Sequence, residues 1–257
     1  MEEKNLQNEE TTVVRHQEPK KNEKQRPVHT TPYSQEIQKH MNKCFPGRTE
    51  RVFFDKLNDY LQVDIHILEA PTKQDFHVLY TVGMSALPMK LPDEFYPDYQ
   101  MLERAELIAL LPAEWQLPEP AEGETYNNTF WWPVDLLQYL ARFPHEYKSW
   151  LGWGHTVPNS DKYVSYDEAS TKLCGVMISA LNEAISMFHA KDGTLINLYA
   201  LLPLYKEEID FKQQEGGEAL LQKMVGKIGR AHVRTPDRKS TRQNSSHGVQ
   251  SRMPSSA

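Results

Sequence analysis

Apolar and polar residues alternate most clearly along residues 61–68, where apolar residues such as Ile65 fall on one face of an extended chain and polar residues such as Asp64 fall on the other. This two-residue period predicts a half-buried β-strand. Residues 76–82 form a second run that is typical of a strand, and a turn around Pro71 separates the two runs. The sequence therefore predicts an antiparallel hairpin.

Longer apolar runs and turn residues predict the remaining elements. The unbroken apolar run at residues 107–111 ends at Pro112 and fits a strand buried on both faces in the middle of a sheet. Pro133 suits the first turn of a helix, which is expected to stop at Pro144. Residues 51–57 fit either a strand or the end of a helix. Further strands are predicted at residues 173–177 and 196–202, and further helices at residues 34–44 and 205–224, the last with a break or bend at Gly216 and Gly217.

The order of these elements decides the fold class. Strands and helices alternate irregularly, and the sequence lacks a Gly-rich phosphate loop. A regular alternation of strand and helix would favour a doubly wound parallel sheet. The order in this chain instead predicts an α+β fold.

The chain divides into three parts by composition. Residues 1–32 contain no aromatic residue and are dense in Glu, Lys, Gln and Asn, which predicts a disordered leader. Residues 33–226 carry the apolar periodicity and are expected to form one domain. Residues 227–257 are rich in Arg, Ser and Pro and are expected to be a disordered basic tail. This tail resembles translated sequencing-adapter read-through, and the alternative is a basic tether for nucleic acid or a membrane.

Net charge is distributed unevenly over these parts. The whole chain has 29 basic and 35 acidic residues. Residues 227–257 hold seven Lys or Arg and one acid, and residues 1–32 hold six residues of each sign. Residues 33–226 therefore carry a net charge of −12. Since an acidic surface speeds association with basic proteins and repels nucleic acid, we expect a protein partner and no nucleic-acid partner.

The sequence also disfavours a membrane protein and a secreted protein. No segment approaches the 18 consecutive apolar residues of a membrane-spanning helix, and the N-terminus lacks the apolar run of a secretory signal. Cys44 and Cys174 lie far apart and in no metal-ligand spacing, so free thiols are expected. These features predict a cytoplasmic protein without a membrane partner.

Two sets of polar residues would suit catalysis. His66, His145 and His155, with the carboxylates of Asp64 and Glu146, are the ligand types that bind zinc or iron in a metal-dependent hydrolase. No pair has the spacing of one helical turn, so we favour contacts with loops around a Trp-rich core. Ser85, His155 and Asp64 are the residue types of a nucleophilic triad, but Ser85 does not lie in a G-x-S-x-G turn. We therefore expect no catalysis, no metal and no cofactor.

Aromatic and acidic side chains provide the candidates for partner binding. Trp is frequent in interface hot spots and also suits a core, and we favour core packing for most Trp residues here. Trp153 is framed by Gly residues and is the best interface candidate. The partner-binding candidates are Trp150, Trp153, His155, Glu207 and Glu208. The two Glu residues also suit the start of a helix, where a carboxylate favours the helix dipole.

Six short motifs follow one another between residues 81 and 208. In chain order they are TVGMS (81–85), RAEL (104–107), WP (132–133), LARFPHE (140–146), WLGWGHTVPN (150–159) and PLYKEE (203–208). Together they resemble the suppressor-of-fused domain family in its bacterial, single-domain form, and their order and spacing match across about residues 50–224.

The resemblance implies a mixed, mostly antiparallel sheet flanked by helices, with no known catalysis and no required cofactor. Animal relatives sequester a transcription factor by clamping its peptide as an added strand between two domains. This chain has only the N-terminal type of domain, so the clamp is not carried over. Bacterial relatives are similar to immunity proteins that neutralise toxins.

These observations lead to three functional hypotheses. The first is a non-catalytic, immunity-type antagonist that sequesters a basic toxin, such as a nuclease whose active surface must hold phosphates. The second is a regulatory or scaffold module that binds an endogenous peptide by strand addition at a sheet edge. The third is the metal-dependent hydrolase.

Overall fold

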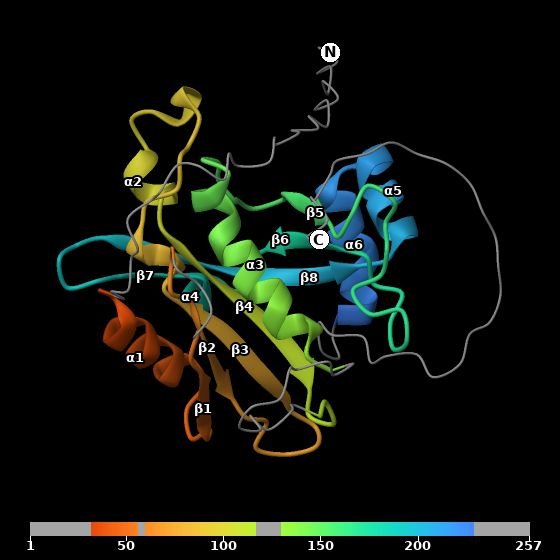
Figure 1. Ribbon diagram of the computed structural model, residues 1–257, viewed down its shortest axis with the longest axis horizontal. Coiled ribbons are helices and arrows are strands. Elements are labelled where there is room, and N and C mark those ends of the chain that lie inside the picture. The colour runs from red at the N-terminus through yellow and green to blue at the C-terminus, as the bar shows by residue number, and fades with distance from the viewer. Residues whose placement is uncertain (1–31, 56–59, 117–129, 229–257) are drawn as a thin grey trace, which may run out of the picture.

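The computed structural model describes residues 32–55, 60–116 and 130–228, in which an eight-stranded sheet carries helices on both faces (Figure 1). The strands are β1 (Glu50–Phe53), β2 (Asp64–Leu68), β3 (Phe76–Val82), β4 (Ala105–Pro112), β5 (Thr156–Pro158), β6 (Gly175–Ser179), β7 (Met187–His189) and β8 (Leu195–Leu204). Nearly all of the expected leader and tail lies outside the described residues.

Helices and short helical turns connect these strands. They are α1 (Ser34–Cys44), α2 (Tyr99–Leu102), α3 (Trp132–Glu146), α4 (Glu183–Ser186), α5 (Lys206–Glu215) and α6 (Gly217–Ile228), with the 3-10 turns η1 (Met84–Ala86) and η2 (Asp93–Phe95). Over the described ranges, none of the helices has both the length and the apolar content needed to cross a membrane.

The sheet is mixed and mostly antiparallel. Its strands are ordered β1-β2-β3-β4-β8-β6-β5, and β7 pairs with the start of β8. Among these pairs only β4 and β8 run parallel. β4 lies in the interior of the sheet with every residue buried, as its apolar run predicted. The predicted α+β fold with a mixed, mostly antiparallel sheet is confirmed.

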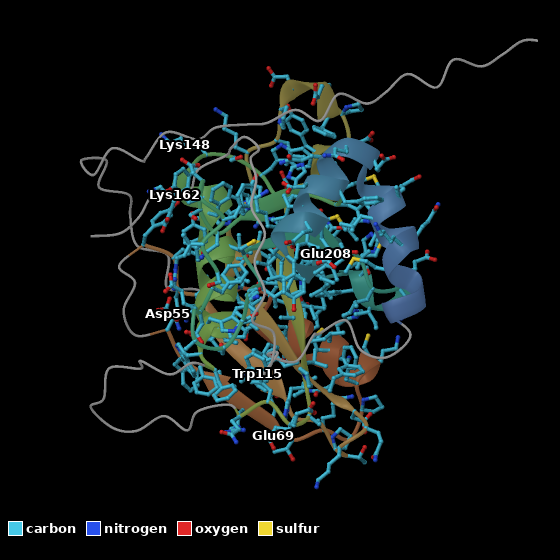
Figure 2. The ribbon with its side chains drawn as sticks, turned by 90° about the vertical axis from the view of Figure 1, so that its right-hand side faces the viewer. Asp55, Glu69, Trp115, Lys148, Lys162 and Glu208 are labelled. Atoms are coloured by element: carbon cyan, nitrogen blue, oxygen red, sulfur yellow. The ribbon has the colours of Figure 1, made fainter. Side chains whose placement is uncertain are left out.

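Helices cover both faces of the sheet (Figure 2). α3 covers one face, where Leu137 joins Leu107 of β4 in the largest apolar cluster. On the opposite face α1 covers the part of the sheet around β3, where Ile37 packs in one cluster with Tyr80. α5 and α6 cover β6 and the end of β8 on that same side, with Ile209 in a third cluster. The sheet therefore has one large core under α3 and two smaller clusters on the opposite face.

The predicted hairpin is formed by β2 and β3, and the ambiguous residues 51–57 contribute to β1, a strand at the edge of the sheet. The predicted end of the central helix was wrong, because α3 continues through Pro144 to Glu146. A proline inside a helix removes one N–H, and its ring crowds the preceding turn. Pro144 stands close to the C-terminal end and is buried, so few helical bonds follow it and its ring packs in the core.

The predicted C-terminal helix breaks where its two Gly residues stand. Gly216 ends α5 with φ of 86°, and α6 begins at the next residue. A positive φ of this size favours glycine, since a β-carbon would strain the backbone there. The two resulting helices contact each other and cover one end of the sheet.

A buried carboxyl group on β4 holds the turn that follows β3. Glu106 is fully buried. Its oxygens accept hydrogen bonds from the hydroxyls of Thr81 and Ser85 at 2.5 and 2.6 Å, and from the backbone N–H groups of Gly83, Met84 and Ser85 at 3.0, 3.3 and 3.0 Å. All these groups donate, which suits the ionised carboxylate. Burial raises the pKa of Glu106, and the hydrogen bonds from Ser85, Thr81 and Gly83 oppose that rise.

Two more side chains hold the same turn. Arg104 donates from Nη1 to the carbonyl oxygen of Ser85 at 2.6 Å, and His145 of α3 donates from Nε2 to the carbonyl oxygen of Met84 at 3.0 Å. Gly83 fits here because a β-carbon would lie 2.2 Å from the carbonyl oxygen of Gln62. Three of the sequence motifs, TVGMS, RAEL and LARFPHE, therefore meet at one buried turn.

We expect Thr81→Val to lower the free energy of unfolding by roughly 1–3 kcal/mol, because it leaves buried polar groups without a partner. The Thr81 hydroxyl donates to Glu106 and also accepts the N–H of Leu107 at 2.9 Å. The matched control is Thr72→Val, whose hydroxyl lies in an exposed turn and should cost less than about 0.5 kcal/mol. Urea unfolding measures both, and equal losses would contradict the buried role of Thr81.

We expect His145 to make the fold less stable in mild acid. Burial lowers the pKa of His145 to about 4, below its ordinary value of 6.5, so the unfolded chain binds this proton first as the pH falls. The free energy of unfolding should therefore decrease between pH 6.5 and pH 4, by roughly 3 kcal/mol in full from this group. Glu106, with its raised pKa, acts in the opposite direction. Urea unfolding of wild type and of His145→Gln at several pH values separates the effect of the histidine from that of other groups. If the free energies of unfolding of the two proteins changed in parallel with pH, His145 would not be the cause.

Candidate functional site

The WLGWGHTVPN segment forms a loop that leads into β5. The Trp150 ring is half-buried and packs against the rings of Phe95 and His155, with centroid distances of 4.8 and 4.3 Å. Gly152 is needed beside it, because a β-carbon there would lie 2.3 Å from Cζ3 of Trp150. Trp150 therefore fixes the shape of the loop and presents only part of its ring to solvent.

Trp153 lies on the same loop, and 53% of its surface is exposed. Hydrogen bonds hold the adjoining backbone to β6: Gly154 donates to the carbonyl oxygen of Ile178 at 2.8 Å, and Ile178 donates to that of His155 at 2.8 Å. A large ring on a fixed backbone loses little conformational entropy when a partner covers it. Trp153 thus has the exposure and the rigid support that an interface anchor requires.

His155 packs against the Trp150 ring within this loop. Burial, with a smaller effect from the nearby Lys212 cation, lowers the pKa of His155 below its ordinary value. The imidazole is therefore neutral at pH 7. His155 consequently contributes packing and polar groups to the site, and no positive charge.

β5 forms one edge of the sheet, directly after the Trp153 loop. Among the described residues its strand partner is β6 alone. The N–H of Asn159 donates to the carbonyl oxygen of Cys174 at 2.7 Å. Since hydrogen-bonded positions alternate along an antiparallel pair, the N–H and C=O of Thr156 point away from β6. This edge offers backbone groups to an added strand, up to Pro158, which has no N–H.

Glu207 and Glu208 stand in the first turn of α5 and have different surroundings. Glu208 is partly buried, and its Oε2 accepts the N–H of Tyr205 at 3.0 Å, which stabilises the start of the helix. Glu207 is exposed in the same turn. Of the two, Glu207 is the more accessible to a partner.

The structure does not bring the three histidines together. His66 lies 2.8 Å from an oxygen of Glu50, His145 bonds the backbone of Met84, and His155 packs on a tryptophan ring. Within the described ranges, no three side chains of His, Cys, Asp or Glu gather in a group that could hold a metal ion.

The residues of the triad hypothesis are likewise held by different partners. Ser85 donates its hydroxyl to Glu106 at 2.6 Å, so that hydroxyl belongs to the buried network of the turn. Asp64 accepts hydrogen bonds from the N–H of Asp55 at 2.9 Å and from the side chain of Gln62. The geometry gives no support to a nucleophilic role for Ser85.

A second exposed surface, around η2 and α2, was not expected from the sequence. Tyr96 is 76% exposed and Met101 is 56% exposed. Figure 1 shows this yellow segment projecting beyond the sheet. A sequence signal does exist, because residues 91–103 hold four acids and no Lys or Arg, together with aromatic residues. That combination indicates an exposed segment that can still make apolar contacts.

Solved structures share this fold. A SUFU homolog from Neisseria gonorrhoeae FA 1090 matches with a TM-score of 0.56 at 15% identity, covering 84% of this chain and 100% of its own. A chain of the Sufu–Fu complex matches with a TM-score of 0.50 at 14% identity, covering 75% of this chain and 83% of its own. Drosophila Suppressor of Fused gives a TM-score of 0.49 at 15% identity, covering 75% of this chain and 46% of its own. At these identities the first two likenesses show the fold alone.

The sequence itself identifies the family. Among curated proteins, none matches this chain. The family model described as Suppressor of fused protein (SUFU) matches residues 59–239, a range that contains all six motifs and runs past residue 226, where the domain was expected to end. The motif resemblance is thereby confirmed, and the chain belongs to the suppressor of fused protein family.

Proposed function

We propose that this chain is a non-catalytic protein-binding domain that sequesters a basic protein, and that the partner is a toxin which it neutralises. The observation that carries the proposal is the exposed Trp153 ring, held on a fixed loop beside the edge strand β5. The net charge of −12 on residues 33–226 supports a basic partner.

The proposed contact uses Trp153 as the anchor. A partner pocket takes the indole ring, while the half-buried Trp150 and His155 keep the loop in one conformation beneath it. Hot spots of this kind lie at the centre of an interface and are surrounded by contacts that exclude water. The rigid loop favours binding because little of its freedom is lost on association.

The acidic net charge of the domain is the reason that we propose a toxin as the partner. A nuclease must carry a basic surface to hold phosphates, and an acidic domain that covers this surface excludes its substrate. Complementary charge also speeds the encounter of the two proteins, which an antagonist needs if it is to act before damage occurs. The absence of catalysis stays a prediction in this proposal.

The place of β5 at the end of the strand order favours a second function, in which the domain binds an endogenous regulatory peptide. The outward N–H and C=O of Thr156 would pair with an added strand, and Trp153 would contact its side chains. This function differs from the first in the identity of the partner. It also needs an extended peptide, whereas a toxin can be bound as a folded domain.

We expect the full chain, used as bait in lysate of the source cell, to retain a basic toxin in near-stoichiometric amount. Trp153→Ala should weaken binding of the captured protein roughly 30-fold, the effect of a hot spot of about 2 kcal/mol. The control is Phe54→Ala, because Phe54 is 65% exposed just after β1, at the opposite edge of the sheet.

Mass spectrometry identifies the retained protein, and titration of the purified pair gives the affinities. Retention of an endogenous regulator would favour the second function over the first. Equal affinity of wild type and Trp153→Ala, or a loss only in Phe54→Ala, would contradict the site.

We also expect the association rate to depend on salt. Raising NaCl from about 50 mM to about 300 mM shortens the screening length and should slow association roughly tenfold, with little change in the dissociation rate. Stopped-flow mixing of the chain with the captured partner measures both rates. An association rate that does not change over this range would contradict the electrostatic part of the proposal.

A further inference from the structure

Three exposed side chains form a second apolar surface, which we call the methionine surface: Tyr96, Met101 and Met187. Their exposed fractions are 76%, 56% and 44%, which makes them three of the most exposed large apolar residues of the described chain. Tyr96 follows η2, Met101 belongs to α2 and Met187 begins β7. Figure 1 shows α2 standing over the β7 end of the sheet.

The two methionines lie on either side of one asparagine. Met187 is directly opposite Asn197 in the pairing of β7 with β8, so the two side chains lie on the same face of the sheet. The amide of Asn197 in turn donates to the carbonyl oxygens of Met101 and Arg104, at 2.9 and 3.2 Å. Segments far apart in the sequence are thereby joined into one surface.

The base of this surface is fixed by packing and hydrogen bonds. The Phe95 ring lies against Trp150, and the hydroxyl of Tyr99 donates to Asp93 at 3.1 Å. The ring of Tyr96 meets that of Tyr99 edge to face at 6.0 Å. An ordered segment therefore holds these apolar side chains at the surface. Apolar groups that gather on an ordered surface often mark an interaction site.

Acidic side chains share the segment that carries Tyr96 and Met101. Residues 91–103 carry Asp93, Glu94, Asp98 and Glu103 and no basic residue, and the first three of these acids are exposed. An apolar surface bordered by acids is complementary to a helix with one apolar face and Lys or Arg beside it. Methionine suits such a contact, since its unbranched side chain adapts to irregular neighbours.

We propose that the methionine surface docks a basic amphipathic helix of the partner protein. This inference rests on the proposed function, because it names the part of the basic partner that a second surface of the domain contacts. It uses side chains other than Trp153, and the two contacts adjoin where the Phe95 ring lies against Trp150 of the Trp153 loop. Two separate contacts would fix the orientation of the partner as well as its affinity.

The test uses a synthetic 18-residue peptide of leucine and lysine, labelled with fluorescein, with leucines spaced to form one apolar face. Fluorescence anisotropy should show that it binds the full chain. The double variant Met101→Ser, Met187→Ser should bind the peptide at least tenfold more weakly. The matched control Phe54→Ser removes an equally exposed apolar side chain elsewhere and should bind within twofold of wild type. Because all three side chains are exposed, the variants should fold, which circular dichroism checks.

Two control peptides separate the apolar and charged parts of the contact. A peptide of the same composition, scrambled to lose its apolar face, should bind at least tenfold more weakly. A version with glutamate in place of lysine should not bind. No binding by wild type, equal binding by the methionine double variant, or equal binding of the scrambled peptide would each overturn the inference.

Failure of this inference can be told apart from failure of the proposed function. Trp153→Ala should leave peptide binding unchanged, because Trp153 belongs to the other contact. If the chain captures a basic toxin through Trp153 but does not bind the peptide, the proposed function stands and the docking surface is wrong. If the peptide binds at the methionines while no basic protein is captured, the docking surface stands and the proposed function is wrong.

Discussion

The buried carboxyl group of Glu106 is the interaction on which the rest of this domain depends. It joins the inner strand β4 to the turn after β3, and that turn is also held by α3 through His145. Leaving a buried donor without an acceptor costs more than a typical hydrogen bond contributes. Since Glu106 accepts several donors at once, alternative conformations of the turn are strongly disfavoured.

The Trp153 loop depends on this turn through the segment that follows the turn. Beyond η1, the N–H of Lys90 donates to the carbonyl oxygen of Ser149 at 3.0 Å, and the N–H of Leu151 lies 3.4 Å from the sulfur of Met89. These contacts place the chain at the start of the Trp153 loop. The family motifs therefore have two different structural roles. TVGMS, RAEL and LARFPHE build the turn inside the protein, whereas WLGWGHTVPN presents an aromatic ring to solvent. Shared motifs of the family thus account for the scaffold, and one of them also carries the exposed Trp153 ring.

The sequence predicted the elements that have a clear pattern of apolar residues. The alternation around Ile65 and the apolar run of β4 identified strands, and Gly216 marked a helix break. The expectation that the first of these strands is half-buried was wrong, because all of β2 is buried, including Asp64 and His66, whose side chains are hydrogen-bonded. The helix was predicted to end at Pro144, but it continues to Glu146. The free-energy cost of a proline in a helix depends on its distance from the helix end, which the local sequence pattern does not show. β5 and β7 were missed, since strands of three residues are too short for a period. The hydrogen bonds of Glu106 and the link from Asn197 on β8 to the backbone of Met101 arise from tertiary contacts, which single-sequence patterns do not contain.

The most direct test of the account is hydrogen–deuterium exchange of the full chain, alone and with its captured partner. In the proposed complex the partner covers the Trp153 loop and the adjoining edge of β5, whose outward backbone groups include Thr156. We expect slower exchange on binding in residues 150–158, with β1 at the opposite edge unchanged. Slower exchange confined to β1, with residues 150–158 unaffected, would contradict the proposed contact.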